Sequence, residues 1–256
     1  MQEWGLRGRL KSFLLDAFSQ GLGVAIEDVV LERSHSPDFG DYFTTGAITI
    51  APRLERSAAE VACMVAEKLS AKAADWISRA EACENGFVNM FIRYAPAATA
   101  LLELEGKLHA LLLAEPIVPE KALTYVANST DKRLAVVGDV LRAITPFIRH
   151  SSSQPPSRDA LTLLRESEEM DLILQLHEFS RIITQKPRSR HSMVGYLYVT
   201  SVKFRDGFMW GKRVAPFWLS NSASTPLHEA REFLVTLTCK ILLLGISLVG
   251  RSDETA

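Results

Sequence analysis

Residues 57–93 read SAAEVACMVAEKLSAKAADWISRAEACENGFVNMFIR, and this stretch decides the fold class. It opens with Ser57 and, three positions later, Glu60, the capping-box pair that starts an amphipathic helix reaching position 71. Two segments of strand character follow at 76–83 and 86–93, with only two residues between them. A helix that leads directly into a pair of strands predicts an α+β domain.

The flanking segments extend this α+β domain over residues 1–114. Its first helix is expected over 6–19, where apolar residues recur at helical spacing. The remaining predictions are a strand at 28–33, a helix within 40–54 that Gly40 and Asp41 cap, and a helix over 96–113 with Pro96 in its first turn.

The second half of the chain has a different character. Residues 115–150 contain a strand-like segment, ALTYVA (122–127), and then an apolar helix, RLAVVGDVLRAI (133–144). A Ser/Pro linker, SSSQPPSR, covers 151–158. From 159 to 256 the pattern is almost entirely helical, which predicts an all-α bundle.

The composition excludes several kinds of protein. The formal net charge is −1, so any nucleic-acid site must come from local clustering of basic residues. Cys63, Cys83 and Cys239 lie far apart without a metal-ligand spacing, so a zinc site is not expected. The sequence has no Gly-rich phosphate loop, and no cofactor is expected. The absence of a long uninterrupted apolar run predicts no membrane span. The N-terminus is typical of neither a signal nor a transit peptide, which favours the cytoplasm and leaves an organellar matrix open.

Four motifs, in order, resemble arginyl-tRNA synthetases. GDYFTTGAITIAPRLERSAAEVACMVAEKL (40–69) and ENGFVNMFI (84–92) resemble the additional N-terminal domain of that family. GYLYVTSVKFRDGF (195–208) and ILLLGISLVG (241–250) resemble its DALR anticodon-binding domain. The resemblance covers both ends of the chain and implies an α+β domain followed by a DALR-like helical domain.

The middle of the chain departs from the family. The strand LTYVA, the turn Asn128-Ser129-Thr130, Arg133 and the helix with Gly138-Asp139 are similar to the start of the family's catalytic domain. The HIGH element and the KMSK-type loop, which act on ATP in the family, are absent, and one strand–helix unit cannot form a nucleotide-binding sheet. The resemblance therefore implies a Rossmann domain reduced to one strand–helix unit, and a protein that is not an enzyme.

The resemblance places a first RNA contact in the GFxN segment. There the family holds a base of the tRNA D-loop with an apolar residue and a polar residue two places on, which are Phe87 and Asn89 in this chain. Alternate residues of a strand share one face, so Phe87 could stack on a base and Asn89 could bond its edge. The alternative, which we weigh equally, is that Phe87 is a core residue and Asn89 caps a loop.

A second candidate, for the anticodon arm, is the basic and aromatic segment 181–213. It carries eight basic residues and one acidic residue, a local excess of seven positive charges. Phe208, where the family often has an anticodon-facing tyrosine, and Trp210 are the expected base stackers, whereas Tyr196 and Phe204 are expected in the core. The expected phosphate contacts are Arg188, Arg190, Lys212 and Arg213. The family's C-terminal methionine corresponds to Ser252, which weakens the case for anticodon specificity.

Two function classes follow from these predictions. The first is a non-catalytic tRNA-binding adaptor that presents tRNA, an arginine acceptor by resemblance, to another factor such as a tRNA-modifying enzyme. The second is a structural subunit of a larger assembly that no longer binds tRNA. The second predicts an exposed apolar surface around Leu134, Val137 and Leu141, where a catalytic domain would have packed.

Overall fold

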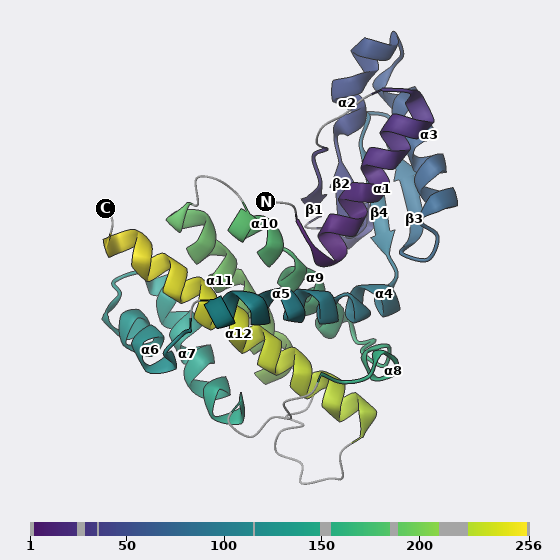
Figure 1. Cartoon of the computed structure of the whole chain (residues 1–256). Helices are drawn as coiled ribbons and strands as arrows, with labels where there is room; N and C mark the ends of the chain where they lie inside the picture. Colours follow the sequence, from purple (N-terminus) through teal and green to yellow (C-terminus); the bar gives the residue numbers. More distant parts are fainter. Residues whose placement is uncertain are drawn as a thin grey trace. The chain divides into compact units, whose positions relative to one another are not determined.

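The computed structural model describes residues 3–24, 29–34, 36–114, 116–148, 155–184, 189–209 and 225–254. The chain divides into two compact units, one of residues 6–97 and one of residues 1–5 together with 98–256. All strands of the described residues belong to the first, the sheet unit, and the second, the helical unit, contains only helices (Figure 1). This arrangement confirms an α+β domain followed by a helical part.

The sheet unit contains a four-stranded antiparallel sheet in the order β1-β2-β4-β3. Its helices are α1 (Gly5–Leu22), α2 (Gly46–Ile50) and α3 (Ala58–Lys72). Its strands are β1 (Glu32–Arg33), β2 (Tyr42–Thr44), β3 (Ile77–Ala82) and β4 (Val88–Ile92). Short 3₁₀ turns, η1 (Pro37–Phe39) and η2 (Ala51–Leu54), complete it. The predicted capping box is present, because Ser57 and Glu60 bond reciprocally at the start of α3.

One face of the sheet is the core of this unit. Tyr42, Val88 and Met90 are directly or diagonally opposed on β2 and β4 and are fully buried. The apolar side of α1 and that of α3, which packs on β3, complete this core. Gly40 precedes β2 with φ +77°, and a Cβ there would lie 2.7 Å from the Met90 carbonyl oxygen, so only glycine fits this entry to the sheet.

The prediction that a helix begins at residues 40–41 is wrong. Residues 42–44 form β2, and α2 begins only at Gly46. Asp41 does not cap a helix: its carboxylate accepts a hydrogen bond from the backbone N–H of Ile92 at 2.7 Å. The side chain therefore joins the start of β2 to the end of β4, a long-range contact that local sequence patterns do not reveal.

The helical unit is built around three long helices, α7 (Lys132–Ile148), α11 (Arg190–Phe204) and α12 (Pro226–Glu254), which pack against one another. The other helices of the described chain in this part are α4 (Tyr94–Thr99), which spans the boundary, α5 (Leu101–Ala114), α6 (Pro119–Asn128), α8 (Arg158–Leu161), α9 (Ser167–His177), α10 (Phe179–Thr184) and the π-helical turn η3 (Arg205–Met209). Gly245 of α12 lets α11 approach closely, since a Cβ there would lie 2.4 Å from Leu197.

The predicted strand–helix connector is instead a pair of helices. Residues 119–128 form α6, with Pro119 in its first turn and with Ala122 and Val126 buried four residues apart on one side. The β-branched and aromatic residues of LTYVA suggested a strand, but the helical spacing of its buried positions prevails. The prediction of one remaining Rossmann strand–helix unit is therefore wrong for this segment.

The boundaries between the units also differ from those predicted. The division falls after residue 97 rather than 114, because Leu101, Leu104 and Leu108 of α5 are buried in the helical unit. The segment 151–158 does not separate two domains, since α7 before it packs on α11 and α12 after it. Residues 151–154 lie outside the described residues, and Ser157 caps α8 by accepting from the Ala160 N–H.

Helix α12 meets the length and composition criteria for a membrane span over Pro226–Arg251, where an 18-residue window has a mean hydropathy of 2.1. However, 72% of that window is buried inside the protein. Helices α7 and α11 pack against α12 and cover its apolar residues. A buried core helix in the middle of a bundle has this composition without a membrane.

Two of the cysteines differ strongly in burial, and this difference gives a first prediction about their reactivity. Cys239 is buried in α12 and burial raises the pKa of its thiol to about 12, whereas Cys63 is exposed on α3. Since the thiolate is the reactive form, iodoacetamide at neutral pH should alkylate Cys63 in the folded protein and leave Cys239 unmodified. Peptide mass spectrometry reads out both sites, and urea should make Cys239 reactive. Equal labelling in native buffer would contradict the packing of α12.

Candidate nucleic-acid interface

The second face of the sheet gathers aromatic side chains. Phe43 of β2 is paired with Asn89 of β4, so their side chains lie on the same face, opposite to that of Tyr42 and Met90. Phe87, just before β4, stacks on Phe43 with ring centroids 5.4 Å apart and an interplanar angle of 6°. Phe91 lies on the same face, and the Arg79 guanidinium covers its ring at 3.9 Å.

The turn before β4 fixes the direction of Phe87. Gly86 has φ +86°, and a Cβ there would lie 2.6 Å from the Ala58 Cβ, so the chain reverses there only with glycine. The Asn85 side chain accepts a hydrogen bond from the Phe87 N–H at 3.2 Å, and the Cys83 N–H donates to the Phe87 carbonyl at 2.8 Å. These bonds hold the Phe87 ring in its place beside Phe43.

The structure brings Phe87 and Asn89 to one face, as the strand periodicity predicts. Phe87 is half-buried. Asn89 is 5% exposed, and its side-chain amide donates to the Cys83 sulfur at 3.3 Å. A thiol is a weak hydrogen-bond acceptor, so Cys83 holds the Asn89 amide only weakly. Phe43, Phe91 and Arg79 were not identified from the sequence, because their placement depends on strand register.

The second predicted site is described only in part. Arg188, Trp210, Lys212 and Arg213 lie outside the described residues. Phe208 is fully buried and stacks on Phe204 at 5.3 Å, so its prediction as a base stacker is wrong. The π-helical turn that follows α11 directs Phe208 inward. Tyr196 and Phe204 are buried, which confirms their prediction as core residues.

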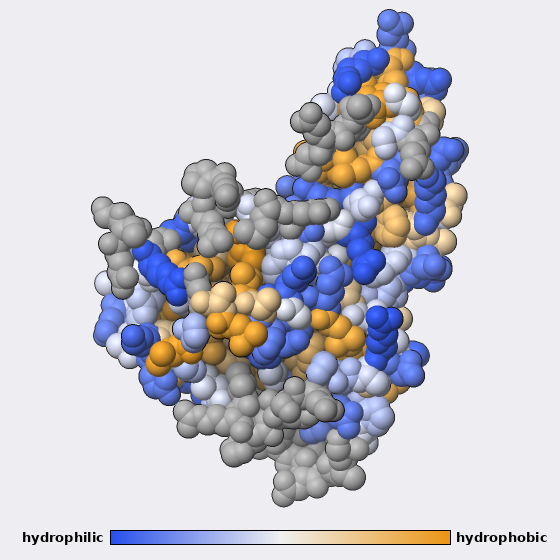
Figure 2. Space-filling model, viewed as in Figure 1, coloured by the Kyte–Doolittle hydropathy of each residue, from blue (hydrophilic) through white to orange (hydrophobic). Residues whose placement is uncertain are grey.

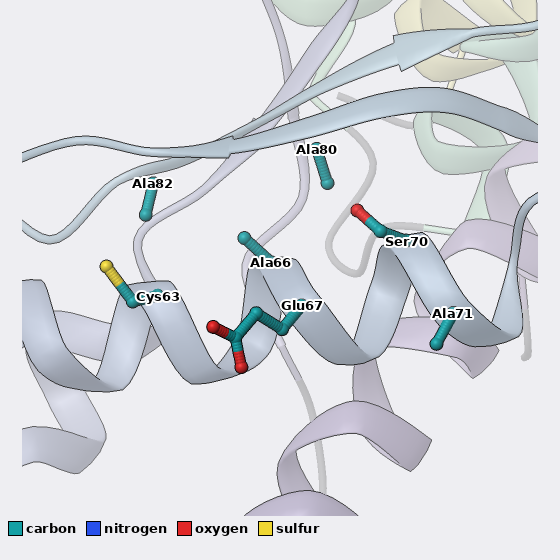
Figure 3. Close-up of a pocket in the computed structure, with 7 residues that line it drawn as sticks. All are labelled: Cys63, Ala66, Glu67, Ser70, Ala71, Ala80 and Ala82. Atoms are coloured by element: carbon teal, nitrogen blue, oxygen red, sulfur yellow. The ribbon is translucent and has the colours of Figure 1, made fainter.

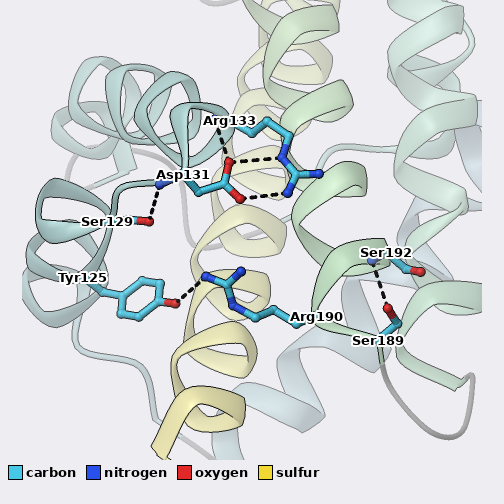
Figure 4. A network of polar contacts seen from close by, with 7 residues as sticks. All are labelled: Tyr125, Ser129, Asp131, Arg133, Ser189, Arg190 and Ser192. Atoms are coloured by element: carbon cyan, nitrogen blue, oxygen red, sulfur yellow. Dashed lines mark hydrogen bonds and ion pairs between the residues drawn. The ribbon is translucent and has the colours of Figure 1, made fainter.

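Arg190 is exposed at the first residue of α11 and belongs to a polar network shown in Figure 4. Its guanidinium lies 3.5 Å from the Tyr125 hydroxyl of α6. Nearby, Asp131 precedes α7 and accepts from the Arg133 backbone N–H at 3.0 Å and from the Arg133 guanidinium at 2.8 Å. Two guanidinium groups therefore lie near one carboxylate.

The charges of this network act on one another. The hydrogen bond from Arg133 is the main reason that the pKa of Asp131 lies below its usual value, and the more distant Arg190 lowers it further. Asp131 in turn raises the pKa of Arg133, which Arg190 opposes through like-charge repulsion.

A pocket of about 290 Å³ lies beside Tyr125, between α6 and the C-terminal part of α12. Its lining combines apolar residues with Lys121 and Arg251, and the Tyr125 ring lies against Gly250. Sequence reasoning missed this pocket because it assigned residues 122–127 to a strand.

Among the described residues, no cluster of His, Cys, Asp and Glu side chains is arranged to hold a metal ion.

Leu134, Val137 and Leu141 are fully buried in the helical unit. The exposed apolar surface that the structural-subunit hypothesis predicted at these residues is therefore not present. Helices α11 and α12 pack on α7 and contribute to covering this part of the helix.

Asp131 provides a prediction about the α6–α7 turn. Replacing Asp131 with alanine removes the carboxylate that accepts the Arg133 N–H, and should lower the free energy of unfolding by about 0.5–2 kcal/mol. The folded-state pKa lies below the unfolded value, so this contribution is present above roughly pH 4 and is lost as the pH falls through the folded pKa. Urea denaturation at pH 7 and at acid pH measures the difference.

The matched control is Asp139→Ala on the same helix. Asp139 pairs with Arg142 at 2.6 Å, but its side chain is 73% exposed, so little change is expected. Equal effects of the two substitutions, or a gap between wild type and Asp131→Ala that grows in acid, would contradict the capping role.

Residues 6–92 match the family model described as the arginyl tRNA synthetase N terminal domain. The match runs from α1 to the end of β4 and includes Phe87 and Asn89. It relates the sheet unit to arginyl-tRNA synthetases, in agreement with the resemblance of residues 40–69 and 84–92. The resemblance of residues 195–250 to the DALR domain stays a prediction.

Proposed function

We propose that the protein is a non-catalytic tRNA-binding adaptor related to arginyl-tRNA synthetases. The observation that carries this proposal is the match of residues 6–92 to the N-terminal domain of those enzymes, together with the aromatic sheet face on which Phe87 and Asn89 lie. A stacked aromatic pair beside an amide is suited to an unstacked base of an RNA loop. The base proposed here is in the tRNA D-loop.

The second proposed contact is between the helical unit and the anticodon arm. Arg190 and Arg133, with Lys121 and Arg251 beside the Tyr125 pocket, supply cations within one folded unit. The sequence adds Arg188, Trp210, Lys212 and Arg213. Basic side chains neutralise phosphates without reading sequence, so choice of an arginine acceptor would rest on the D-loop contact.

The proposal includes the absence of aminoacylation. The HIGH and KMSK elements are missing from the sequence, and residues 119–148 form two helices in place of the start of a nucleotide-binding sheet. The adaptor would therefore deliver tRNA to another protein, such as a tRNA-modifying enzyme. A cytoplasmic location fits this role and is part of the proposal.

The purified full chain should bind tRNA and lose affinity as salt is raised. A plot of log Kd against log salt concentration should be linear, because bound cations release condensed counterions from the phosphates. The same protein with arginine, ATP and tRNA should give no pyrophosphate exchange above a blank without protein. Reversal of Arg190 and Arg133 together should weaken binding to all tRNAs alike and flatten the salt dependence.

These measurements separate the parts of the proposal. Absence of salt-dependent tRNA affinity would refute the adaptor and leave the structural subunit. Pyrophosphate exchange would refute the non-catalytic assignment alone. Retained affinity after the double charge reversal would remove the helical-unit contact while leaving the sheet face in place.

A further inference from the structure

Strand β3 is an open edge of the sheet. The strand order places it last, with β4 as its only partner among the described strands. The Met90 carbonyl of β4 accepts from Asp41 on the β2 side, so Ala80, which is paired with Met90, directs its own N–H and C=O away from β4. Ala82, two residues further on, does the same. The backbone groups of Ala80 and Ala82 are thus oriented to receive another strand.

A shallow groove of about 690 Å³, wide open to solvent, runs alongside this edge between β3 and α3 (Figure 3). Ala80 and Ala82 point from β3 toward the helix, and Cys63, Ala66 and Ser70 line the helix side. All five side chains are small, so the groove has room for side chains of an added strand. Elsewhere the same sheet face is closed by large buried residues such as Tyr42 and Met90.

Features that prevent an edge strand from pairing with another strand, such as a bulge, occur only at the start of β3. The register is irregular between Ile77 and Arg79, and such a bulge interrupts pairing there. Arg79 and Glu81 point to the opposite face and pair with each other at 3.1 Å, so their charges do not project into the groove. Residues 79–82 therefore form the short part of the edge that can be extended.

The charge in the groove indicates the kind of occupant. Glu67 of α3 is exposed, and among the described residues that line the groove it is the only charged one. A second copy of this chain is a poor occupant, because its β3 edge would direct only the alanine side chains of residues 80 and 82 into the groove and would bring no cation to Glu67. A segment with a lysine or arginine among its groove-facing residues is complementary to both the shape and the charge.

We propose that this edge and groove form a docking site for a short extended segment of a partner protein, which adds to β3 as a strand and directs a basic side chain to Glu67. Main-chain hydrogen bonds to Ala80 and Ala82 supply affinity, and the groove selects alternate side chains. The site lies on β3 and α3, away from the face that carries Phe87 and Asn89. It therefore does not depend on tRNA binding.

The test uses the full chain and a fluorescein-labelled peptide of alternating threonine and valine with one lysine at a groove-facing position. Fluorescence anisotropy should show saturable binding, and glutamate in place of the lysine should weaken it about tenfold or more. N-methylation of the peptide N–H groups that face β3 should abolish binding. N-methylation of the N–H groups on the opposite edge of the peptide should be tolerated. Bound peptide should also slow alkylation of Cys63, which lies in the groove.

Three variants locate the site. Ala80→Pro removes an outward N–H from an edge strand, where proline is tolerated, and should weaken binding at least tenfold. Ser70→Phe fills the groove and should do the same, and Glu67→Lys should reverse the preference between the lysine and glutamate peptides. The matched control is Lys68→Glu, an exposed change on the same helix outside the groove lining, which should leave the preference unchanged. All four should retain wild-type tRNA affinity if tRNA binds elsewhere.

No saturable binding by the lysine peptide, or binding that survives Ser70→Phe and Glu67→Lys unchanged, would overturn the proposal. A concentration-dependent dimer that Ala80→Pro dissociates would assign the edge to a second copy instead and would also overturn it. Loss of tRNA binding by the wild-type chain would bear on the adaptor role and not on this site.

Discussion

Replacing Glu169 with alanine is expected to destabilise the helical unit by about 3–5 kcal/mol, the range for removing one partner of a buried ion pair. Glu169, near the start of α9, has no exposed surface. One of its carboxylate oxygens lies 2.6 Å from the Arg231 guanidinium of α12, and the other accepts the backbone N–H groups of Arg165 and Glu166. The substitution leaves a largely buried guanidinium and two backbone donors without this acceptor.

Glu169→Gln separates the two contributions. The amide retains an oxygen that can accept the N–H groups at the start of α9 but loses the charge that pairs with Arg231, so a smaller destabilisation is expected. The matched control is Asp171→Ala on the same helix. Asp171 pairs with Lys203, but both side chains are partly exposed, so its loss should cost no more than about 1 kcal/mol.

Urea denaturation followed by far-ultraviolet circular dichroism measures these differences. The chain has two compact units, so unfolding can occur in more than one step, and the shift should appear in the step that carries most of the helical signal. A Glu169→Ala variant as stable as Asp171→Ala would show that the ion pair between α9 and α12 does not form in solution.

The elements that local patterns describe well were predictable. The capping box at Ser57, the strand pair β3–β4 and the long apolar helix α12 follow from residues that are close in the sequence. Segments in which long-range contacts decide the outcome were not. Residues 122–127 have strand-like composition, and become part of α6 because Ala122 and Val126 are buried in the helical unit.

In the candidate site, too, the features set by local patterns were predictable and those set by long-range contacts were not. The alternation of a strand places Phe87 and Asn89 on one face, and the structure agrees. The neighbours that make this face aromatic, Phe43 and Phe91, depend on the register of β2 and β4, which no local rule supplies. The position of a family tyrosine predicts Phe208 as a base stacker, yet the π-helical turn directs its side chain into the core.

The last prediction concerns the sheet face and tests the tRNA-binding role directly. Phe87→Ala should weaken tRNA binding by about 1–3 kcal/mol, roughly 5- to 150-fold in Kd, the range for losing one base–aromatic stack. Asn89→Ala should cost about 1 kcal/mol and should act mainly on tRNAs that carry the preferred D-loop base. Electrophoretic mobility shift or anisotropy with individual tRNA transcripts measures both effects.

Two controls distinguish a lost contact from a disturbed sheet. Phe87→Trp keeps an aromatic face against Phe43 and should retain most of the affinity, whereas a merely structural role would make the larger ring at least as harmful as alanine. Phe39→Ala removes an aromatic ring that is 60% exposed on η1 and should leave binding unchanged. If Phe39→Ala weakens binding and Phe87→Ala does not, the RNA contact lies elsewhere in the sheet unit.

Cys83 offers a sharper test, because it holds the Asn89 amide in the structure. A serine hydroxyl is a stronger acceptor than a thiol, so Cys83→Ser should compete better with a base edge and weaken binding of the preferred tRNA. Cys83→Ala removes the competing acceptor and should leave that affinity equal or higher. Serine and alanine are similar in size. Their effects on tRNA affinity should therefore have opposite signs only if the Asn89 amide leaves Cys83 to bind a base. Identical affinities for wild type, Cys83→Ser and Cys83→Ala would show that the Asn89 amide stays within the protein and that RNA recognition on this face rests on Phe87 alone.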